Sequence, residues 1–315
     1  MYSLSDYGSM IADTARMDPY AFALKEAIGH ESVVLDIGTA TGIHALLACK
    51  FGARHVYAVE ENDAIEIARQ AAVANGCDDR ITFLEGMSTE IVLPERASVI
   101  VSDLRGVLPP FQQHIPTIVD ARARHLAADG VLIPQRDTLW AALIEAPRLY
   151  RDLQAPWDRP YGLDMRAAAL AVLNSWTQDD TGAISCRNLL TNGCEWATLD
   201  YTSVVEATVS GTMAADALRS GVAHGLLVWF DTELWDGIGF GNGPGSPSMA
   251  SVYGRAFFPL LEPVDVAERD AVEVTIEARY DGNGYDWWWR TTVRPAGEAN
   301  QIKAVFEQTT SVEPR

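Results

Sequence analysis

Hydrophobic positions in the first 133 residues form short apolar runs separated by segments of helical spacing. The spacing predicts helices at 43–50, 63–74 and 112–127. The preceding segment 8–29 is also helical in pattern, with a break or a new helix start predicted at Pro19. Alternation of this kind predicts an α/β domain with a parallel, Rossmann-like sheet. The runs expected to form its buried strands are 33–37, 56–59, 81–84, 99–101 and 131–133.

The pattern changes at Pro134, after which hydrophobic and polar residues alternate with the period of β-strands. Gly and Pro punctuate this half densely, as in 241–245. A helical segment at about 161–175 interrupts it. The second half is therefore predicted to be a barrel or sandwich. Clear alternating runs are 138–143, 225–230 and 272–276, and we also expect 287–289 to be a strand with one face in the core.

The first strand opens into a turn that contains Gly38 and Gly42, and the second strand ends at Glu60. The glycines allow a tight turn and close approach of a ligand, and the glutamate can accept hydrogen bonds from both hydroxyls of a ribose. Ala40 replaces the middle glycine of a dinucleotide fingerprint, and Asp36 suits a cation better than a phosphate. These residues favour S-adenosylmethionine (SAM), which carries a sulfonium, over NAD. An ordinary turn with incidental acids is the alternative.

Ser102 and Asp103 follow the fourth apolar run, at the carboxyl edge of the expected sheet, where ligands bind. Methyl transfer from a sulfonium depends mainly on alignment of the nucleophile, the methyl carbon and the sulfur. Asp103 could orient an amine or accept the proton that the amine must lose. Arg105 could bind a substrate carboxylate or form a surface salt bridge. We expect His44 to be a packing or surface residue.

Composition narrows the classes of protein and partner. The 315 residues are 48% hydrophobic, which is typical of a globular protein, and the formal net charge is −19. This charge argues against a nucleic-acid partner and is compatible with cationic substrates. No apolar stretch is long enough to span a membrane, the N-terminus lacks the regions of a signal peptide, and the four cysteines lack zinc-site spacing. We therefore expect a cytoplasmic protein with reduced thiols, no metal and no membrane partner.

Six short motifs are spread along nearly the whole chain. They are Met10-x-x-Asp13-x-x-Arg16-x-x-x-Tyr20, Leu35-Asp36-Ile37-Gly38, Ala58-Val59-Glu60, Leu132-Ile133-Pro134, Tyr161-Gly162-Leu163-Asp164-Met165 and Val228-Trp229-Phe230-Asp231. These motifs resemble those of the protein arginine methyltransferases. The order of an α/β domain, a proline junction and a β half interrupted by a helical segment is similar to that family too.

The resemblance implies a Rossmann-like SAM-binding domain at 1–133 and a β-barrel-like substrate and dimerisation domain at 134–315. A helical arm at about 150–176 would support a homodimer. In the donor site, Arg16 would pair with the methionine carboxylate of SAM, beside Asp36, Gly38, Gly42 and Glu60, and Met87 and Ser88 would face the adenine. The residues expected at the substrate are Tyr7, Met10, Arg105, Ser251 and Tyr253.

The sequence departs from this family at the acceptor site. The family holds the substrate guanidinium between two glutamates, which by alignment fall on Asp103 and Gln112. Its Thr-His-Trp triplet falls on Ser251-Val252-Tyr253, so the histidine is absent. A guanidinium has a pKa above about 12 and arrives protonated, so two carboxylates would neutralise and align it. Replacing one charged hydrogen bond by a neutral one costs roughly 1–2 kcal/mol, which disfavours arginine methylation.

Three hypotheses remain. The preferred one is a SAM-dependent methyltransferase of this architecture that methylates a peptide or a small amine-bearing metabolite, preferably on nitrogen, with Asp103 and Gln112 as catalytic residues. The second is a protein arginine N-methyltransferase that uses the same two residues. The third is a catalytically silent SAM-binding scaffold subunit.

Overall fold

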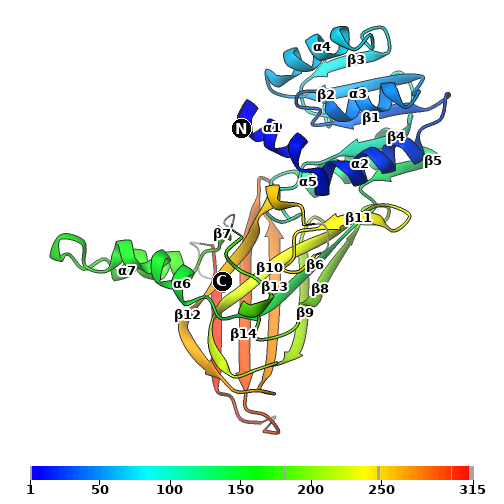
Figure 1. Cartoon of the computed structure of the whole chain (residues 1–315). Helices are drawn as coiled ribbons and strands as arrows, with labels where there is room; N and C mark the ends of the chain where they lie inside the picture. The colour runs from blue at the N-terminus through cyan, green and yellow to red at the C-terminus, as the bar shows by residue number, and fades with distance from the viewer. Residues whose placement is uncertain (1, 180–181, 247–248, 299, 312–315) are drawn as a thin grey trace.

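The chain folds into two bodies, as the computed structural model shows for residues 2–179, 182–246, 249–298 and 300–311. In Figure 1 the N-terminal body lies above, a body of antiparallel strands lies below, and a helical arm projects from the lower one. A parallel sheet followed by antiparallel sheets confirms the predicted fold class. The expected boundary at 133/134 falls between the last strand of the upper sheet and the first strand of the lower body.

The upper body is built on a parallel five-stranded sheet in the order β3-β2-β1-β4-β5. All five residues of β1 are buried, as expected for a strand covered on both faces. Its elements are α1 (Leu4–Ala12), α2 (Thr14–Ala27), β1 (Val33–Ile37), α3 (Ile43–Lys50), β2 (His55–Glu60), α4 (Ala64–Ala74), β3 (Ile81–Glu85), β4 (Ala97–Ser102), α5 (His114–Arg124) and β5 (Leu126–Ile133).

The N-terminal segment forms two helices, but the break is not at Pro19 as expected. Ser3 caps α1, so this helix begins before residue 8. The break is at Asp13, whose side chain accepts the N–H of the third helical residue and so begins α2. Pro19 lies inside α2, where Tyr20 and Leu24 are fully buried. Their packing holds the helix together across the position that lacks a backbone donor.

The helix expected at 112–127 is the shorter α5, which ends at Arg124. It ends there because β5 begins at Leu126, before the apolar run expected at 131–133. Ala97 pairs with Leu126, and two residues further along β4, Val99 pairs with Val131. The residues between Leu126 and Val131 therefore form a bulge in β5. Asp129 and Gly130, expected as a turn, lie in this bulge.

The lower body consists of a six-stranded and a four-stranded antiparallel sheet. The first has the order β7-β12-β10-β6-β8, with β11 paired to β10, and the second has the order β15-β14-β13-β9. Alternation along β14 buries Trp287 and Trp289, whereas Trp288 is only partly buried, as expected from the sequence. The strands are β6 (Arg136–Ile144), β7 (Thr177–Asp179), β8 (Cys194–Asp200), β9 (Val209–Asp216), β10 (Gly221–Trp235), β11 (Ile238–Gly241), β12 (Arg255–Val266), β13 (Ala271–Tyr280), β14 (Tyr285–Arg294) and β15 (Ala304–Thr309).

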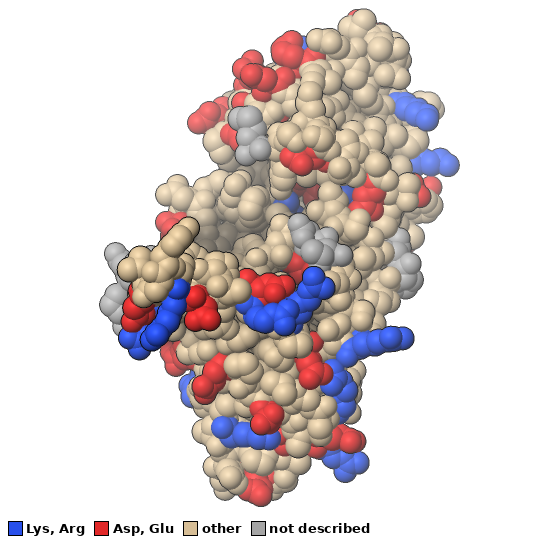
Figure 2. Space-filling model, turned by 60° about the vertical axis from the view of Figure 1, so that its left-hand side comes forward, with Lys and Arg blue, Asp and Glu red and all other residues tan. Residues whose placement is uncertain are grey.

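The arm contains α6 (Pro147–Gln154) and α7 (Arg166–Leu173), joined by two short 3-10 turns. It begins earlier than the helical segment expected at 161–175, because Pro147 occupies the first turn of α6, a position that suits proline. Figure 2 shows a hollow between the arm and the upper body, with acidic and basic side chains interspersed around it. None of the helices in the described residues is long and apolar enough to cross a membrane.

The two bodies share one hydrophobic core. A single buried cluster runs from the upper sheet through Tyr20 and Leu24 of α2 to Phe230 and Phe240 of the lower body. The helix α2 therefore lies at the junction, and its polar face is presented to the ends of β1 and β4. This arrangement sets the place of the candidate site.

Candidate active site

The site lies where the strand order of the upper sheet reverses. β1 is central, with Ile37 paired to Val59 of β2 on one side and to Ser102 of β4 on the other. The loops that follow these three strands therefore meet at one edge. In open α/β sheets this is the position at which ligands bind. It brings together the glycine turn, Glu60 and Asp103, which the sequence interpretation placed at separate strand ends.

The turn after β1 requires glycine at two positions. Gly38 has φ +72° and Gly42 has φ +92°, a region that L side chains rarely adopt. A Cβ at Gly38 would lie 2.6 Å from Leu104 Cδ2, and one at Gly42 would lie 2.9 Å from Ala68 Cβ. The tight path of this loop therefore follows from the glycines, and it leaves the backbone open to a ligand.

Asp36 is completely buried at the start of this loop. Its Oδ2 accepts hydrogen bonds from Thr39 Oγ1 at 2.6 Å and from the Ala45 N–H at 3.0 Å. Its Oδ1 accepts no hydrogen bond from any described residue. Burial raises the pKa of Asp36 to about 7, although the two hydrogen bonds act in the opposite direction. A buried carboxylate oxygen without a donor fits a cationic ligand group such as the ammonium of SAM.

His44 lies beside Asp36 and not on the surface. Its ring is 4.7 Å from the ring of Tyr20 between centroids, and its Nδ1 is 3.9 Å from Asp36 Oδ1. Burial, with a smaller effect of Arg16, lowers the pKa of His44 to about 3, so the imidazole is neutral. The packing role expected from the sequence agrees with this burial. Its closeness to the donor-site acid was missed, although the position two residues after Gly42 offered a signal.

Glu60 connects the end of β2 to the glycine turn. Its carboxylate accepts hydrogen bonds from the backbone N–H groups of Ala40 at 2.8 Å, Glu61 at 3.0 Å and Asn62 at 3.3 Å. These donors fix the side chain between the two strand ends. A ribose between β1 and β2 would meet this carboxylate, as the sequence interpretation expects.

The residues expected near the adenine follow β3. Gly86 donates its N–H to the Glu60 carbonyl at 2.9 Å, which places this loop beside the end of β2. Met87 is exposed, and Ser88 is buried, with its carbonyl accepting a hydrogen bond from Arg124 Nη2 at 2.7 Å. The loop therefore adjoins Glu60.

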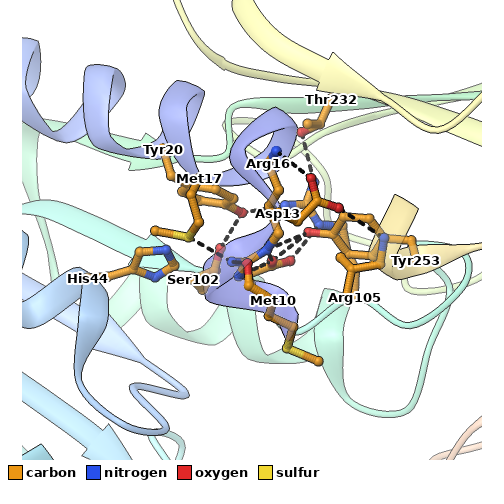
Figure 3. A network of polar contacts seen from close by, with 12 residues as sticks. Met10, Asp13, Arg16, Met17, Tyr20, His44, Ser102, Arg105, Thr232 and Tyr253 are labelled. Atoms are coloured by element: carbon orange, nitrogen blue, oxygen red, sulfur yellow. Dashed lines mark hydrogen bonds and ion pairs between the residues drawn. The ribbon is translucent and has the colours of Figure 1, made fainter. Parts of the chain in front are cut away.

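Asp103 is the centre of a buried charge cluster. Figure 3 labels the side chains that bind it, Arg16, Arg105 and Tyr253. Its Oδ2 lies 2.7 Å from Arg16 Nε and 2.6 Å from Arg16 Nη2, and it accepts a hydrogen bond from the Tyr253 hydroxyl at 2.5 Å. Its Oδ1 accepts a hydrogen bond from Arg105 Nε at 3.0 Å. Burial alone would raise the pKa of Asp103, but Arg105 and Arg16 hold this pKa below its usual range. The carboxylate is therefore charged and bound on both oxygens.

Arg105 is completely buried, which differs from both expectations for it. Its Nη1 donates to Asp137 Oδ1 at 2.9 Å and to Thr232 Oγ1 at 2.8 Å, and its Nη2 donates to the Tyr20 hydroxyl. The side chain thus neither faces a substrate carboxylate nor forms a surface salt bridge. It links the loop after β4 to β6 and β10 of the lower body.

Arg16 and Asp13 connect α2 to both bodies. Besides Asp103, Arg16 donates from Nη1 to the Met10 carbonyl at 3.2 Å. Asp13 Oδ2 accepts the Val252 N–H at 3.0 Å and the Ser251 hydroxyl at 3.3 Å. The N-terminal motif and the 251–253 turn, far apart in the sequence, are therefore side by side.

Two family models match the chain. One, described as ribosomal protein L11 methyltransferase, matches residues 21–150, and the other, the arginine methyltransferase oligomerization subdomain, matches residues 135–284. The chain is 31% identical to protein arginine N-methyltransferase 1 of Schizosaccharomyces pombe over 230 residues, which are 71% of this chain and 67% of that protein. It is 28% identical to the Dictyostelium discoideum protein of the same name, over 97% of this chain and 92% of that one. The chain belongs to the protein arginine methyltransferase family. It is therefore a SAM-dependent methyltransferase by family, and its donor is SAM.

Solved structures of this family share the fold. The Trypanosoma brucei PRMT1 enzyme–prozyme heterotetrameric complex with AdoHcy contains a chain that superimposes with a TM-score of 0.85 at 24% identity, covering 96% of each chain. Arabidopsis thaliana protein arginine methyltransferase 10 gives a TM-score of 0.83 at 21% identity, covering 98% of each chain. The likeness therefore includes both bodies and the arm.

Gln112, at the second position of the family's acid pair, forms no hydrogen bond to Asp103, at the first position, within the described residues. It is exposed, with φ +42°. Tyr7 accepts a hydrogen bond from Asn62 Nδ2 at 3.4 Å, and Met10 is half-buried. Of the expected acceptor-site residues, Tyr253 and Arg105 contact Asp103 directly, whereas Ser251 lies against Asp13.

Proposed function

We propose that this protein transfers a methyl group from SAM to a guanidinium nitrogen of arginine in a protein substrate. The observation that carries the proposal is the carboxylate of Asp103, which lies beside the donor loop and already binds guanidinium N–H groups on both oxygens. The names of the curated relatives point to the same acceptor. Of the two acceptors in the hypothesis preferred from the sequence, a peptide or a small amine-bearing metabolite, these names give no support to the metabolite.

In this proposal, the chain orients its two substrates. Bound SAM supplies an electrophilic methyl group on a sulfonium. Asp36 Oδ1 would hold the ammonium, Arg16 the carboxylate and Glu60 the ribose. Contact of Arg16 with a donor carboxylate would draw it from Asp103 and free Oδ2 for the acceptor. These contacts place the nucleophile in line with the methyl carbon, which is the main requirement of the reaction.

Asp103 acts by orientation and charge in this scheme. Its carboxylate would accept an N–H of the acceptor guanidinium and turn another nitrogen toward the methyl carbon. As the C–N bond forms, the C–S bond breaks and its electron pair stays on sulfur, giving S-adenosylhomocysteine (SAH). The methylated nitrogen then loses one proton to water, because a carboxylate with a lowered pKa is a weak base.

The test is methyl transfer to an arginine-rich peptide. Purified protein and SAM are incubated with the peptide, with the same peptide carrying Arg→Lys at each position, and with free amines. SAH release and the mass of the peptide are measured. We expect release and peptide methylation that depend on arginine. Release with free amines but not with the peptide would overturn the proposal.

The second candidate is a SAM-binding subunit without its own turnover. It is favoured by the occupation of both Asp103 oxygens by internal guanidinium groups and by the exposed position of Gln112. One similar structure is described as an enzyme–prozyme complex, and this description distinguishes an enzyme subunit from a prozyme subunit. SAH binding by calorimetry with no release for any arginine peptide would favour this candidate.

We further propose a homodimer formed through the arm and a cytosolic location. The arm carries the fully exposed Tyr161 and the exposed Leu163 and Leu170, an apolar surface suited to a partner copy. The four cysteines of the chain are free thiols in the structure, as is usual in a reducing compartment.

A further inference from the structure

The guanidinium of Arg105 occupies a cage that has the chemistry of an arginine-binding site. Four aromatic rings surround it, with the guanidinium carbon 5.4 Å from the ring centroid of Phe230, 5.6 Å from Phe240, 5.8 Å from Tyr253 and 6.0 Å from Tyr20. Two buried carboxylates complete the cage. Rings at this distance stabilise a cation through their negative faces. The cage at the acceptor acid is thus filled by a residue of the chain itself.

Arg105 is more firmly attached than Arg16, the other guanidinium at Asp103. Its contacts outside Asp103 are to the Asp137 carboxylate, the Thr232 hydroxyl and the Tyr20 hydroxyl, on three different elements. Apart from Asp103, Arg16 donates hydrogen bonds to the Tyr253 hydroxyl, one backbone carbonyl and the sulfur of Met17. Of these two guanidinium groups in the described structure, Arg105 is the one paired with a second acid. Oδ1 of Asp103 is therefore held by the more firmly attached arginine, whereas Oδ2 would keep the Tyr253 hydroxyl as donor once Arg16 leaves it.

The charges of this cluster balance without a substrate. Arg16 and Arg105 carry two positive charges, and Asp103 and Asp137 carry two negative charges when ionised. All four side chains are nearly or fully buried, so solvent screens them little. A protonated acceptor guanidinium would meet a carboxylate that Arg105 has already neutralised.

We propose that Arg105 is a built-in occupant of the guanidinium cage, which leaves Asp103 Oδ2 alone for the acceptor and keeps the affinity for arginine low. This inference rests on the proposed arginine acceptor and makes Arg105 a specificity-determining residue of that site. It predicts that an acceptor guanidinium is held by one oxygen, and that removal of the Arg105 charge tightens its binding.

The test removes the internal cation together with its second acid. In the double variant Arg105→Met, Asp137→Asn, the net charge is unchanged and no buried carboxylate is left without a partner. Binding of an arginine peptide to the protein–SAH complex is measured by calorimetry, with the citrulline peptide as a blank. We expect the Kd of the arginine peptide to fall by about tenfold, or about 1.4 kcal/mol, with no change for citrulline.

Arg105→Lys separates charge from shape. Lysine keeps the positive charge near Asp103 Oδ1 but loses the planar set of donors. We expect its peptide Kd to remain close to that of the wild-type protein. A fall in Kd equal to that of the double variant would overturn the role of the Arg105 charge.

A second buried Arg–Asp pair in the lower body provides a matched control. Arg255 Nη2 lies 3.0 Å from Asp179 Oδ2, and both side chains are buried. Arg255→Met with Asp179→Asn removes the same groups outside the site. Its peptide Kd should not fall, and its melting temperature reports the loss of such a pair on the fold alone.

The outcomes distinguish this inference from the proposed function. Tighter binding of the arginine peptide by the double variant supports the inference, even if neither the wild-type protein nor the variant transfers a methyl group. In that case only the proposed activity is refuted. Unchanged or weaker binding by a folded double variant overturns the inference, whether or not the wild-type protein methylates the peptide. Binding of arginine and citrulline peptides with equal affinity in all variants would refute both.

Discussion

At the scale of single residues, Asp103 joins three side chains of the site, because Arg16, Arg105 and Tyr253 all bind its two oxygens. Asparagine at this position keeps the shape but removes the charge that both buried guanidinium groups share, so Arg105 keeps Asp137 whereas Arg16 loses the carboxylate that it pairs with. Removing one partner of a buried ion pair is strongly destabilising. We expect Asp103→Asn to lower the free energy of unfolding by about 3 kcal/mol, measured by denaturant titration.

The same variant should separate the donor from the acceptor. Asp103 competes with the donor carboxylate for Arg16, so SAH affinity by calorimetry should not fall, whereas methyl transfer should fall. Turnover equal to that of the wild-type protein would remove Asp103 from the reaction.

Asp36 should make donor binding depend on pH. Its pKa is raised to about 7, above the ordinary value of an aspartate, because the carboxyl is buried. Only the ionised form attracts an ammonium, so below this pKa binding must first displace a proton. We expect the Kd of SAH to be constant above about pH 8 and to rise by up to about tenfold per unit below about pH 7. Calorimetry across this range, with proton release from buffers of different ionisation enthalpy, measures the effect.

Two variants identify the group that titrates. Asp36→Asn should bind SAH more weakly and show a flat profile. His44→Gln should keep the shape of the wild-type profile, because the pKa of His44 is lowered to about 3 and the ring does not titrate in this range. A flat profile for His44→Gln would assign the titration to the imidazole instead.

At the scale of elements, the glycine turn between β1 and α3 sets the geometry of the donor site. In Gly42→Ala, the new Cβ would lie 2.9 Å from Ala68 Cβ on α4, at a φ of +92° that alanine rarely adopts. We expect a loss of about 2 kcal/mol in the free energy of unfolding, together with weaker SAH binding. Gly29→Ala is the matched control, because its Cβ would meet nothing within 4 Å. Equal losses in the two variants would mean that the turn is not strained by a side chain.

The elements also explain which parts of the site the sequence could predict. Gly38 and Glu60 stand directly after an apolar run, and Asp103 is separated from one by Ser102 alone. The rule that ligands bind at the carboxyl edge of a parallel sheet therefore finds all three from local pattern. The partners of Arg105 lie 32 residues away at Asp137 and 127 residues away at Thr232. No local pattern encodes a pairing across two domains. The same reason explains why Arg105 was expected to bind a substrate carboxylate or to form a surface salt bridge.

At the scale of the whole molecule, the buried network ties the two bodies into one unit. Arg105 of the upper body binds Asp137 of β6 and Thr232 of β10, and Asp137 Oδ2 accepts a hydrogen bond from the Tyr201 hydroxyl at 2.6 Å. Tyr201 in turn contacts His114 Nε2 at 2.9 Å. The acceptor acid and the domain junction therefore share the same side chains, so a movement of one body against the other would alter the acceptor site.

The arm exposes apolar side chains that the proposed dimer would cover. Tyr161 is fully exposed, and Leu163 beside it is exposed as well. We expect Tyr161→Asp with Leu163→Asp to shift the protein from dimer to monomer in light scattering, because two charges would have to be buried at the contact. Val205→Asp, at an exposed apolar residue in the loop between β8 and β9, is the control and should leave the mass unchanged. A wild-type protein that is monomeric at all concentrations would refute the dimer, and a double variant that remains a dimer would place the contact elsewhere.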